Sequence, residues 1–586
     1  MDSVNGPVGD TGRTPAGNFP VAQRLMRGYA PAAVLVLVVA LTAILVPSRV
    51  PKSANSSNVG PAGSGAVIGN GSGSSASTSI PSATAPPSGQ VASSGTTTKG
   101  GTGGKAGSAG TAGSAGSTVV TPGKVEPCSG QTEQVPGDPY SPPCQTFSGS
   151  NGGATATGVS ANTITVTARL TTDESFQQTL AKLAGAQLQD TNADNQRTLN
   201  VLAKYFNTHF QFYGRQIQIK YFTGQGSLSN ELQGYGQADA EVDAKTAQSL
   251  GSFADVTAES EPYATALWND GIMGFGDPYM PNYWHEQHAP YDWSLATDGT
   301  DLATSAANYA VQKLCPAGSP AAYAGGSIKG APRKFAGIVP ENELYVTSGQ
   351  VFQSIMAAHG CQETQFEYSL DLGTESQQAS NLVAQLKAGG YTTIICGCDP
   401  IFPVYLSGQA AQQNYFPEFV EIGAALVDQD YVGQLYNQQF YAHAFGISPN
   451  EATVPYTQSI GYAAYESECQ SDPTLCGGQG PAYFVNLIYS QLDMMAIGIQ
   501  MAGPDLTPAN FQAGMFAYPP KLGPAGLWGF STTQHTIPND FREVCWSPNT
   551  VSPFNGKMGA YVQTSTQRWS ATSIPSGPPG CTIPSS

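Results

Sequence analysis

The sequence predicts an α/β fold built from two doubly wound, parallel-sheet lobes. Two observations predict it. From about Gly158 onward, short β-branched runs alternate with amphipathic helical stretches, which is the pattern of strand–helix–strand units in parallel sheets. The alternation comes in two series, separated near Tyr291–Gly299. We therefore expect two such sheets, each with helices on both faces.

The first series holds four expected strands and three expected helices. The stretch RQIQIKYF alternates apolar and polar residues, as a half-buried strand does, and Leu199, Leu202, Tyr205 and Phe206 lie on one face of a helix. The expected strands are Thr163–Ala168, Arg215–Phe222, Ala254–Ala258 and Ile272–Phe275, and the helices Asp194–His209, Asp239–Ser249 and Tyr263–Asp270.

The second series repeats the pattern, with glycines after two of its helices. The expected strands are Lys334–Val339, Thr364–Ser369, Tyr391–Cys396 and Glu418–Ile422, and the helices Asp301–Leu314, Glu343–His359, Ser376–Ala388, Pro403–Asn414 and Tyr483–Met501. The segment Trp528–Trp546 is extended and aromatic, and we expect strands there that return to close the structure.

An uncharged apolar run precedes the globular part. Residues 29–47 are just long enough to span a bilayer, which takes about 17–25 residues, and are flanked by Arg24 and Arg27. This run is either a signal anchor that stays in the membrane or a signal peptide that is removed. We favour the anchor, with residues 1–28 as a short cytosolic tail. The globular domain would then lie on the extracellular side of the cell membrane, or be secreted if the run is cleaved.

A low-complexity tract separates this run from the domain. Residues 48–120 are rich in Gly, Ser, Thr and Ala and lack the apolar side chains that a core requires, so we expect a disordered linker. Residues 121–157 follow as a Cys-stapled loop, and residues 158–586 form the two-lobed domain. The formal net charge is −17 with only 11% charged residues, and no basic block occurs, which argues against nucleic-acid binding.

Ten cysteines, all after the apolar run, indicate an oxidising location. Their spacing favours four local disulfide pairs: Cys128–Cys144, Cys315–Cys361, Cys469–Cys476 and Cys545–Cys581. Cys396 and Cys398 are left over, and we expect two packed thiols at a strand end, with a metal or redox role as the alternative.

The order of these elements resembles a known family. The stretches GVSANTITV, LGSFADVTAESEPYATALWNDGIMGFG, RKFAGIVPENELYVTSGQVFQSIMAAHG and DLGTESQQASNLVAQLKAGGYTTIICGCDP, with a late helix and FREVCW, are similar to type I periplasmic solute-binding proteins. The likeness is to the Leu/Ile/Val-binding branch, substrate-binding components of ABC transporters, and runs from about Gly158 to Trp569.

The resemblance implies two lobes joined by three hinge crossings, with a ligand held between them. It places the crossings near Asp292–Gly299, Tyr441–Ser448 and Gly526–Thr533. Lobe 1 would comprise about residues 158–295 and 445–528, and lobe 2 about 296–444 and 529–570. In open α/β sheets, ligands bind outside the carboxyl ends of the strands.

Candidate ligand-binding residues lie at those strand ends: Glu259, Ser260, Tyr279, Tyr345, Asp399 and Phe402. Ser260 is either an anion contact or a plain helix N-cap, and Asp399 either lines the cleft or forms a turn before Pro400. Tyr345 is the best single candidate for a ligand contact, and a half-buried core tyrosine is its alternative.

One departure from the family affects the ligand. Amino-acid binders usually carry an acid in the loop after the last second-lobe strand, whereas this chain has Ile422-Gly423-Ala424-Ala425. This departure weakens the expectation of a branched-chain amino acid, and the ligand expected is a small polar molecule, an amino acid or a related compound. We expect it to be delivered to a separate membrane permease of the ABC type. The alternative is a ligand-sensing or cell-envelope interaction domain on the same fold.

Catalysis is not expected, nor is a cofactor. His285-Glu286-Gln287-His288 is one residue short of the HExxH pattern that sets two histidines on one helical face. Zinc bound by His285, His288 and Asp292 is the alternative to ordinary polar loop residues, and we expect no metal.

Overall fold

The computed structural model describes residues 123–170, 179, 190–316 and 318–584. The apolar run at 29–47 and the linker at 48–120 lie outside these residues. Within the described ranges, no helix combines the length and the hydropathy that crossing a bilayer requires.

The first lobe is built on a five-stranded sheet, all of whose strands run parallel. Its order is β4 (Gln216–Thr223), β3 (Thr163–Leu170), β5 (Ala254–Asp255), β6 (Met273–Phe275) and β7 (Asp292–Trp293). The direction of strand addition reverses between β3 and β5, which is the switch point where doubly wound sheets form ligand sites.

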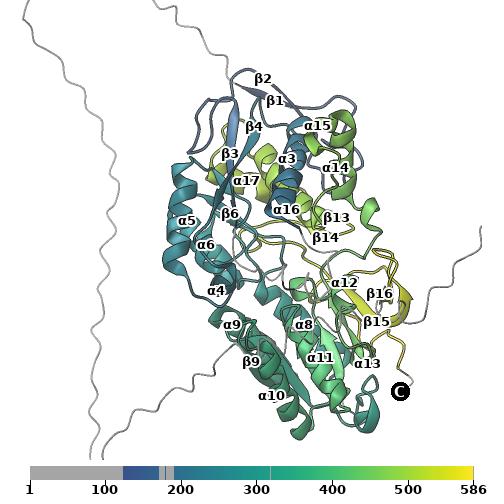
Figure 1. Cartoon of the computed structure of the whole chain (residues 1–586). Coiled ribbons are helices and arrows are strands. Elements are labelled where there is room, and N and C mark those ends of the chain that lie inside the picture. Colours follow the sequence, from purple (N-terminus) through teal and green to yellow (C-terminus); the bar gives the residue numbers. More distant parts are fainter. Residues whose placement is uncertain (1–122, 171–178, 180–189, 317, 585–586) are drawn as a thin grey trace, which may run out of the picture. The chain divides into compact units, whose positions relative to one another are not determined.

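Helices cover both faces of this sheet (Figure 1), because its strands carry apolar side chains on alternate sides. On one face lie α5 (Gln237–Ser249) and α6 (Glu261–Asn269), and on the other α3 (Asn192–His209), α14 (Ile460–Ser471), α16 (Val485–Ala502) and α17 (Pro508–Ala517). Shorter elements complete the lobe: α4 (Leu228–Leu232), α7 (Asn282–His288), α15 (Pro473–Cys476) and the hairpin of β13 (Lys521–Gly523) and β14 (Gly526–Trp528).

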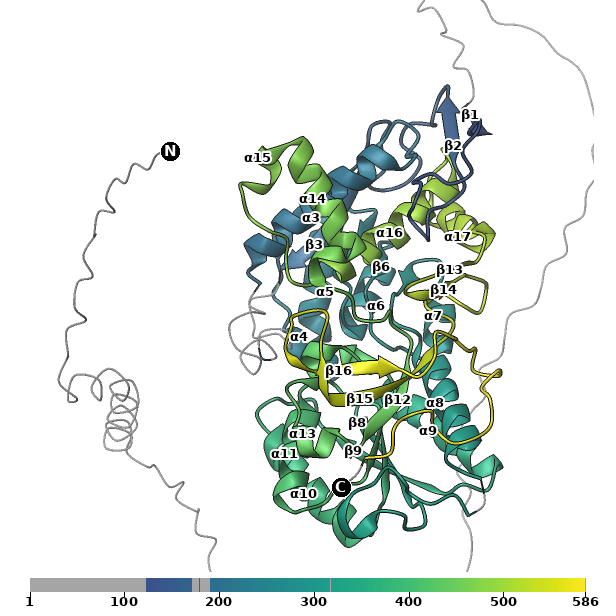
Figure 2. The same cartoon turned by 90° about the vertical axis from the view of Figure 1, so that its right-hand side faces the viewer.

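The second lobe repeats the same winding and extends it. Its seven-stranded sheet has the order β9 (Glu363–Tyr368), β8 (Phe335–Pro340), β10 (Thr393–Cys396), β11 (Glu418–Glu421), β12 (Ala444–Ser448), β15 (Arg542–Val551) and β16 (Met558–Gln563). The strands from β9 to β12 are parallel, and β15 and β16 join antiparallel (Figure 2). On one face of this sheet lie α8 (Gly299–Lys313) and α9 (Glu343–Ala358). On the other face lie α10 (Glu375–Ala388), α11 (Phe402–Gln412), α12 (Asp430–Gly433) and α13 (Gln438–Tyr441).

The predicted fold class, α/β with two doubly wound lobes, is confirmed by these strand orders. The chain crosses between the sheets after β7, after β12 and between β14 and β15. The crossing predicted at Tyr441–Ser448 is wrong, because β12 pairs with β11 and β15 inside the second sheet and the chain leaves only after Ser448. The first and third crossings lie side by side, with the Asp298 N–H donating to Thr536 Oγ1 at 3.0 Å.

The segment before the first lobe is part of its core rather than a separate loop. It contains the antiparallel pair β1 (Lys124–Pro127) and β2 (Gln145–Ser148). The Tyr140 ring stacks on Trp528 with a centroid separation of 3.9 Å, and the Tyr518 hydroxyl donates to the Tyr140 carbonyl at 2.6 Å. Removing this segment would therefore expose part of the core of the first lobe.

The four predicted disulfides are confirmed. The expectation for the remaining two cysteines was wrong, because Cys396 and Cys398 are joined to each other by a fifth disulfide. No cysteine of the described residues is left free.

Candidate functional site

A cavity of about 360 Å³ lies between the carboxyl ends of the two sheets. Loops that follow β5, β6 and β7 form its wall on the first lobe, and loops that follow β8, β10, β11 and β12 form its wall on the second. Its volume falls in the range of about 300–1,000 Å³ that is typical of small-molecule pockets. The carboxyl-end edges of the two sheets therefore face the same cavity.

Four of the six predicted site residues line this cavity: Glu259, Tyr279, Tyr345 and Asp399. They come from three loops and the first turn of one helix, and from both lobes, so the strand-end argument brings distant parts of the sequence together. Their binding of a ligand stays a prediction.

Ser260 and Phe402 lie outside the cavity lining. Ser260 is fully buried, and its hydroxyl donates to a carboxylate oxygen of Glu231 at 2.5 Å. Phe402 is fully buried and stacks on Tyr368 with a centroid separation of 3.9 Å. Neither side chain reaches the cavity, because each turns into its lobe to meet a partner that is far away in the sequence.

The cavity wall is mostly apolar. Leucine, isoleucine, alanine and aromatic side chains from both lobes predominate, among them Leu232, Leu302, Phe352, Ile395, Phe484 and Leu487. Its acidic members are Glu259, Glu363 and Asp399. Within the described part of the chain, no lysine, arginine or histidine belongs to the lining.

A buried arginine lies near Glu259 in the first lobe, but two carboxylates already neutralise its charge. Arg169 is buried and donates to Glu231 at 2.8 Å and to Asp243 at 3.2 Å, and its guanidinium lies 3.8 Å from the Tyr263 ring centroid. Burial raises the pKa of Glu259, and the charge of Arg169 partly offsets that rise. Because two carboxylates already surround Arg169, it leaves no free cation for an anionic ligand.

Asp399 faces the cavity, yet its carboxylate is engaged inside the second lobe. It accepts hydrogen bonds from the Tyr368 hydroxyl at 2.6 Å and from the backbone N–H groups of Ile401 at 2.7 Å and Phe402 at 3.2 Å. Burial raises its pKa, and these hydrogen bonds oppose the rise. The carboxylate therefore acts first as a turn and helix-start former, the second of the two roles predicted for it.

A hydrogen bond across the cleft joins the two lobes. The Ala425 N–H, in the loop after β11, donates to the Tyr279 hydroxyl, in the loop after β6, at 2.6 Å. Tyr279 has φ of +58°, Ala425 +48° and Leu426 +66°, a backbone region that non-glycine residues rarely adopt. Such backbone persists where surrounding contacts enforce it, commonly at clamps and sites. We call this contact the cross-lobe latch.

Tyr345 also bridges the cleft. It lies in the first turn of α9 in the second lobe, yet together with Leu344 it packs against the apolar cluster beneath α5 and α6 of the first lobe. Burial raises the pKa of its hydroxyl, to which Asp277 and Tyr279 also contribute. Its side chain is half-buried and lines the cavity, so it has a structural and a site-facing part at once.

Sequence reasoning missed the contribution of α4 and α16 to the site. Leu228 and Leu232 of α4 and Leu487 and Gln491 of α16 line the cavity. Gln491 donates to the carbonyls of Val256 at 2.6 Å and Phe275 at 2.8 Å, which closes the ends of β5 and β6. Leu487 remains 39% exposed and lines the cavity.

Comparisons with known proteins identify similar folds at low sequence identity. No protein-family model and no curated protein matches the chain. Among solved structures, a solute-binding protein of an ABC transporter from Rhodopseudomonas palustris HaA2, in complex with p-hydroxybenzoic acid, matches with a TM-score of 0.49 and 12% identity. That match covers 70% of this chain and 98% of that one.

Two further solved structures match in the same way. The fatty acid ABC transporter substrate-binding protein from Thermomonospora curvata gives a TM-score of 0.48 at 12% identity, covering 72% of this chain and 97% of that one. The branched-chain amino acid transporter substrate binding protein from Streptococcus pneumoniae, in complex with isoleucine, gives 0.45 at 12% identity, covering 69% and 100%. At these identities the ligands of those proteins are not assigned to this chain.

Proposed function

We propose that this chain is a solute-binding protein that captures a small molecule between its two lobes. The observation that carries the proposal is a cavity lined by strand ends of both sheets. Ligands of open α/β sheets bind at that edge. The three crossings provide hinges about which two such lobes open and close.

The cavity favours a ligand with an apolar body and a neutral or cationic polar group. Its lining offers large apolar and aromatic surfaces and three carboxyl groups, without a basic side chain among the described lining residues. A buried anion would lack a partner there and would lose several kcal/mol of hydration. An α-amino acid, whose carboxylate needs such a partner, is therefore less suited to this cavity than an amine or an alcohol of similar size.

The starts of two helices next to the cavity also disfavour an anionic ligand. Free N–H groups at a helix N-terminus are a common anion site. At α9 the Asn342 side chain already accepts from the Leu344 N–H at 3.0 Å, and at α11 Asp399 holds the N–H groups of Ile401 and Phe402. These donors are occupied, so the starts of α9 and α11 offer an anion few free N–H groups, whereas the start of α6, next to Glu259, has no side-chain cap.

The test is a thermal-shift screen of the full-length protein with two matched series that differ only in the polar group. One series is 4-hydroxybenzylamine, 4-hydroxybenzyl alcohol and 4-hydroxybenzoate, and the other is hexylamine, hexanol and hexanoate. A ligand at 100 times its Kd should add about 2.7 kcal/mol of stability. We expect amine or alcohol members to raise Tm, and Tyr345→Ala to abolish the rise. A rise with the carboxylates alone, or none in a folded protein, would contradict the proposal.

We further propose that the chain is tethered to the cell membrane by residues 29–47, works outside the cell, and delivers its ligand to an ABC-type permease without catalysing a reaction. Support comes from the order of apolar run, Gly/Ser-rich linker and cysteine-rich domain in the sequence. Ligand-dependent cross-linking of the chain to a permease in intact cells is the expected result. A cross-linking pattern without any transport protein would favour a sensing or envelope role instead.

A further inference from the structure

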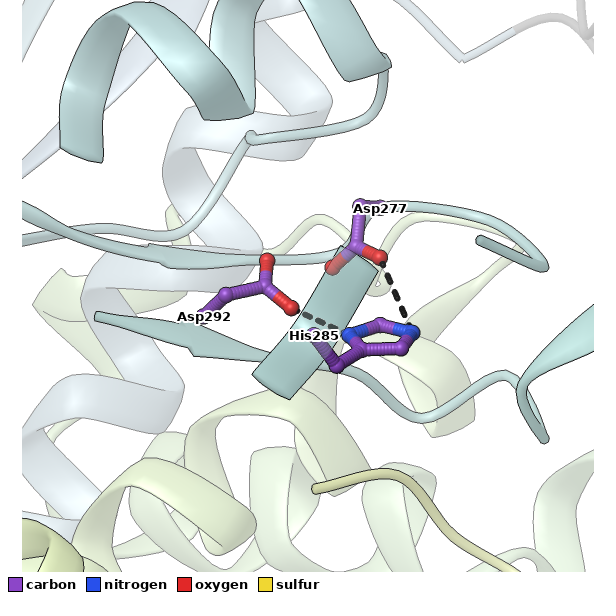
Figure 3. Close-up of side chains that lie close together, drawn as sticks. All are labelled: Asp277, His285 and Asp292. Atoms are coloured by element: carbon purple, nitrogen blue, oxygen red, sulfur yellow. Dashed lines mark hydrogen bonds and ion pairs between the residues drawn. The ribbon is translucent and has the colours of Figure 1, made fainter. Parts of the chain in front are cut away.

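Three acid and imidazole side chains meet inside the first lobe, beside the cleft but outside its lining (Figure 3). Asp277 follows β6, His285 lies in α7, and Asp292 opens β7, so the connection between two neighbouring strands supplies all three. One ligand-type atom from each lies within 4.8 Å of the others. The relative exposures are 0% for Asp277, 1% for His285 and 3% for Asp292.

The contacts within this cluster leave several polar atoms without partners. His285 Nδ1 contacts Asp292 Oδ2, and His285 Nε2 faces Asp277 Oδ2 at 3.8 Å, too far for a hydrogen bond. Both Asp277 oxygens, His285 Nε2 and Asp292 Oδ1 are buried with no hydrogen-bond partner. Each unsatisfied buried group of this kind costs about 1–3 kcal/mol, so four of them together call for an occupant.

Charge balance points to a cation. Among the described residues, the ion pairs of Asp277 and Asp292 involve His285 alone, with no lysine or arginine. As metal ligands, the two carboxylates would bring two negative charges to the site, which one divalent ion would neutralise.

We propose that Asp277, His285 and Asp292 bind one divalent transition-metal ion, with zinc as the best match. One imidazole nitrogen and two carboxylate oxygens form a donor set that zinc accepts, with a fourth position for water. Calcium and magnesium prefer oxygen ligands throughout. Tetrahedral ligands at about 2.0–2.2 Å from zinc lie roughly 3.3–3.6 Å apart. To close on the ion, the cluster would contract on the Asp277 side and open the closer contact between His285 and Asp292.

This site differs from the one that the sequence alone raised as an alternative. His288 is not a member, because its ring stacks on Trp284 with a centroid separation of 3.9 Å and its Nδ1 bonds to the Trp284 carbonyl at 2.7 Å. Asp277 takes its place, from a strand end eight positions before His285 in the chain. The expectation of no metal stays a prediction, and the site proposed instead is one that only the fold assembles.

The ion would have a structural role at the start of a loop that lines the cleft. The loop that begins at Asp277 continues through Tyr279, which lines the cavity and forms the cross-lobe latch. Fixing Asp277 to α7 and β7 would hold the base of that loop. This inference does not depend on the identity of the cleft ligand or on the proposed function.

The experiment measures zinc in untagged full-length protein from zinc-supplemented cells, after passage over a chelating resin, by elemental mass spectrometry. We expect one zinc ion per chain in the wild type and in the control His288→Gln, which lies in the same helix outside the cluster. Asp277→Asn and Asp292→Asn should each bind zinc at least about 100-fold more weakly. Losing a group that only hydrogen-bonds to a metal ligand already weakens binding by up to about 100-fold, so losing a ligand should cost at least that much.

Two results would overturn the proposal. One is wild-type protein without zinc whose Tm does not rise when zinc is added during refolding, which would indicate that a water or shared protons fill the cluster. The other is zinc retention unchanged in both asparagine variants. If either variant fails to fold, the visible spectrum of cobalt-loaded wild type decides: a nitrogen- and oxygen-ligated site gives d–d bands, and their absence contradicts the site.

Discussion

The cross-lobe latch gives the sharpest prediction about the cleft. Tyr279→Phe removes the hydroxyl that accepts a hydrogen bond from the Ala425 N–H across the cleft at 2.6 Å. In the closed arrangement of the variant, that N–H has no acceptor among the described residues. A net hydrogen bond contributes about 0.5–1.5 kcal/mol, and an unsatisfied buried N–H costs about 1–3 kcal/mol. We therefore expect the closed arrangement to lose about 1–2 kcal/mol relative to an open one in which water reaches that N–H.

That loss corresponds to a factor of about 5–30 in the closed-to-open ratio. The affinity for any ligand that needs both walls should fall by at most the same factor, because the apparent affinity follows the closed fraction, which changes less than the ratio when the closed state predominates. Amide hydrogen exchange of the full-length protein measures this directly, in the peptide that spans residues 422–428. Exchange there should accelerate about 5- to 30-fold, while peptides from β3 and β8 in the two sheet cores stay unchanged.

The matched control is Tyr283→Phe, the same substitution in an exposed tyrosine of α7. It should leave exchange at residues 422–428 as in the wild type. Equal exchange in wild type and Tyr279→Phe would show that the latch does not contribute to closure, and acceleration throughout both lobes would show general destabilisation instead.

Three further predictions concern the lobes. Arg169→Met should cost about 3–5 kcal/mol in urea unfolding, because it leaves the buried Glu231 and Asp243 unpaired. Lys521→Met, which breaks a more exposed pair with Glu133, should cost less than about 1 kcal/mol, and equal losses would refute the assignment. Burial, with the neighbouring Asp399 and Asp371 charges, raises the pKa of Glu375 from 4.5 to about 9, so the folded state holds a proton that the unfolded state releases. Wild-type stability should therefore fall relative to Glu375→Gln as pH rises from about 5 to 9, and parallel profiles would contradict this. Replacing Cys128 and Cys144 together by serine should lower the unfolding free energy by about 3 kcal/mol, because the closed loop spans 16 positions and carries Tyr140 into the core; an unchanged urea midpoint would show that the staple is dispensable.

The sequence predicted the parts of the fold that depend on local periodicity. The helix expected at Asp301–Leu314 is α8 at Gly299–Lys313, and the strand expected at Lys334–Val339 is β8 at Phe335–Pro340. Short elements were missed. Because β7 has two residues and α7 has seven, neither is long enough to show a period, and β12 was placed in a crossing although it is buried throughout.

The sequence predicted the site residues whose position depends on the order of strands and helices. It did not predict those whose position depends on pairing with a side chain far away in the chain. Strand ends converge in any doubly wound sheet, so Glu259, Tyr279, Tyr345 and Asp399 could be placed near one cavity from the order of elements alone. The pairing of Asp399 with Tyr368, across 31 positions, leaves no local signal. The same holds for Ser260 with Glu231 and for the meeting of Asp277 with His285.

The most direct test of the central claim, that the cleft holds a ligand with an apolar body, compares two leucines. Leu487 is 39% exposed within the cavity wall, and Leu522 is 69% exposed in β13, outside it. With the amine or alcohol that raises Tm most, isothermal titration of Leu487→Asn should give a Kd about 5- to 30-fold higher than that of the wild type, from the loss of about 1–2 kcal/mol of apolar contact. Leu522→Asn should bind as the wild type does. Equal affinities in all three proteins would contradict the account, because the ligand would then bind away from the cleft.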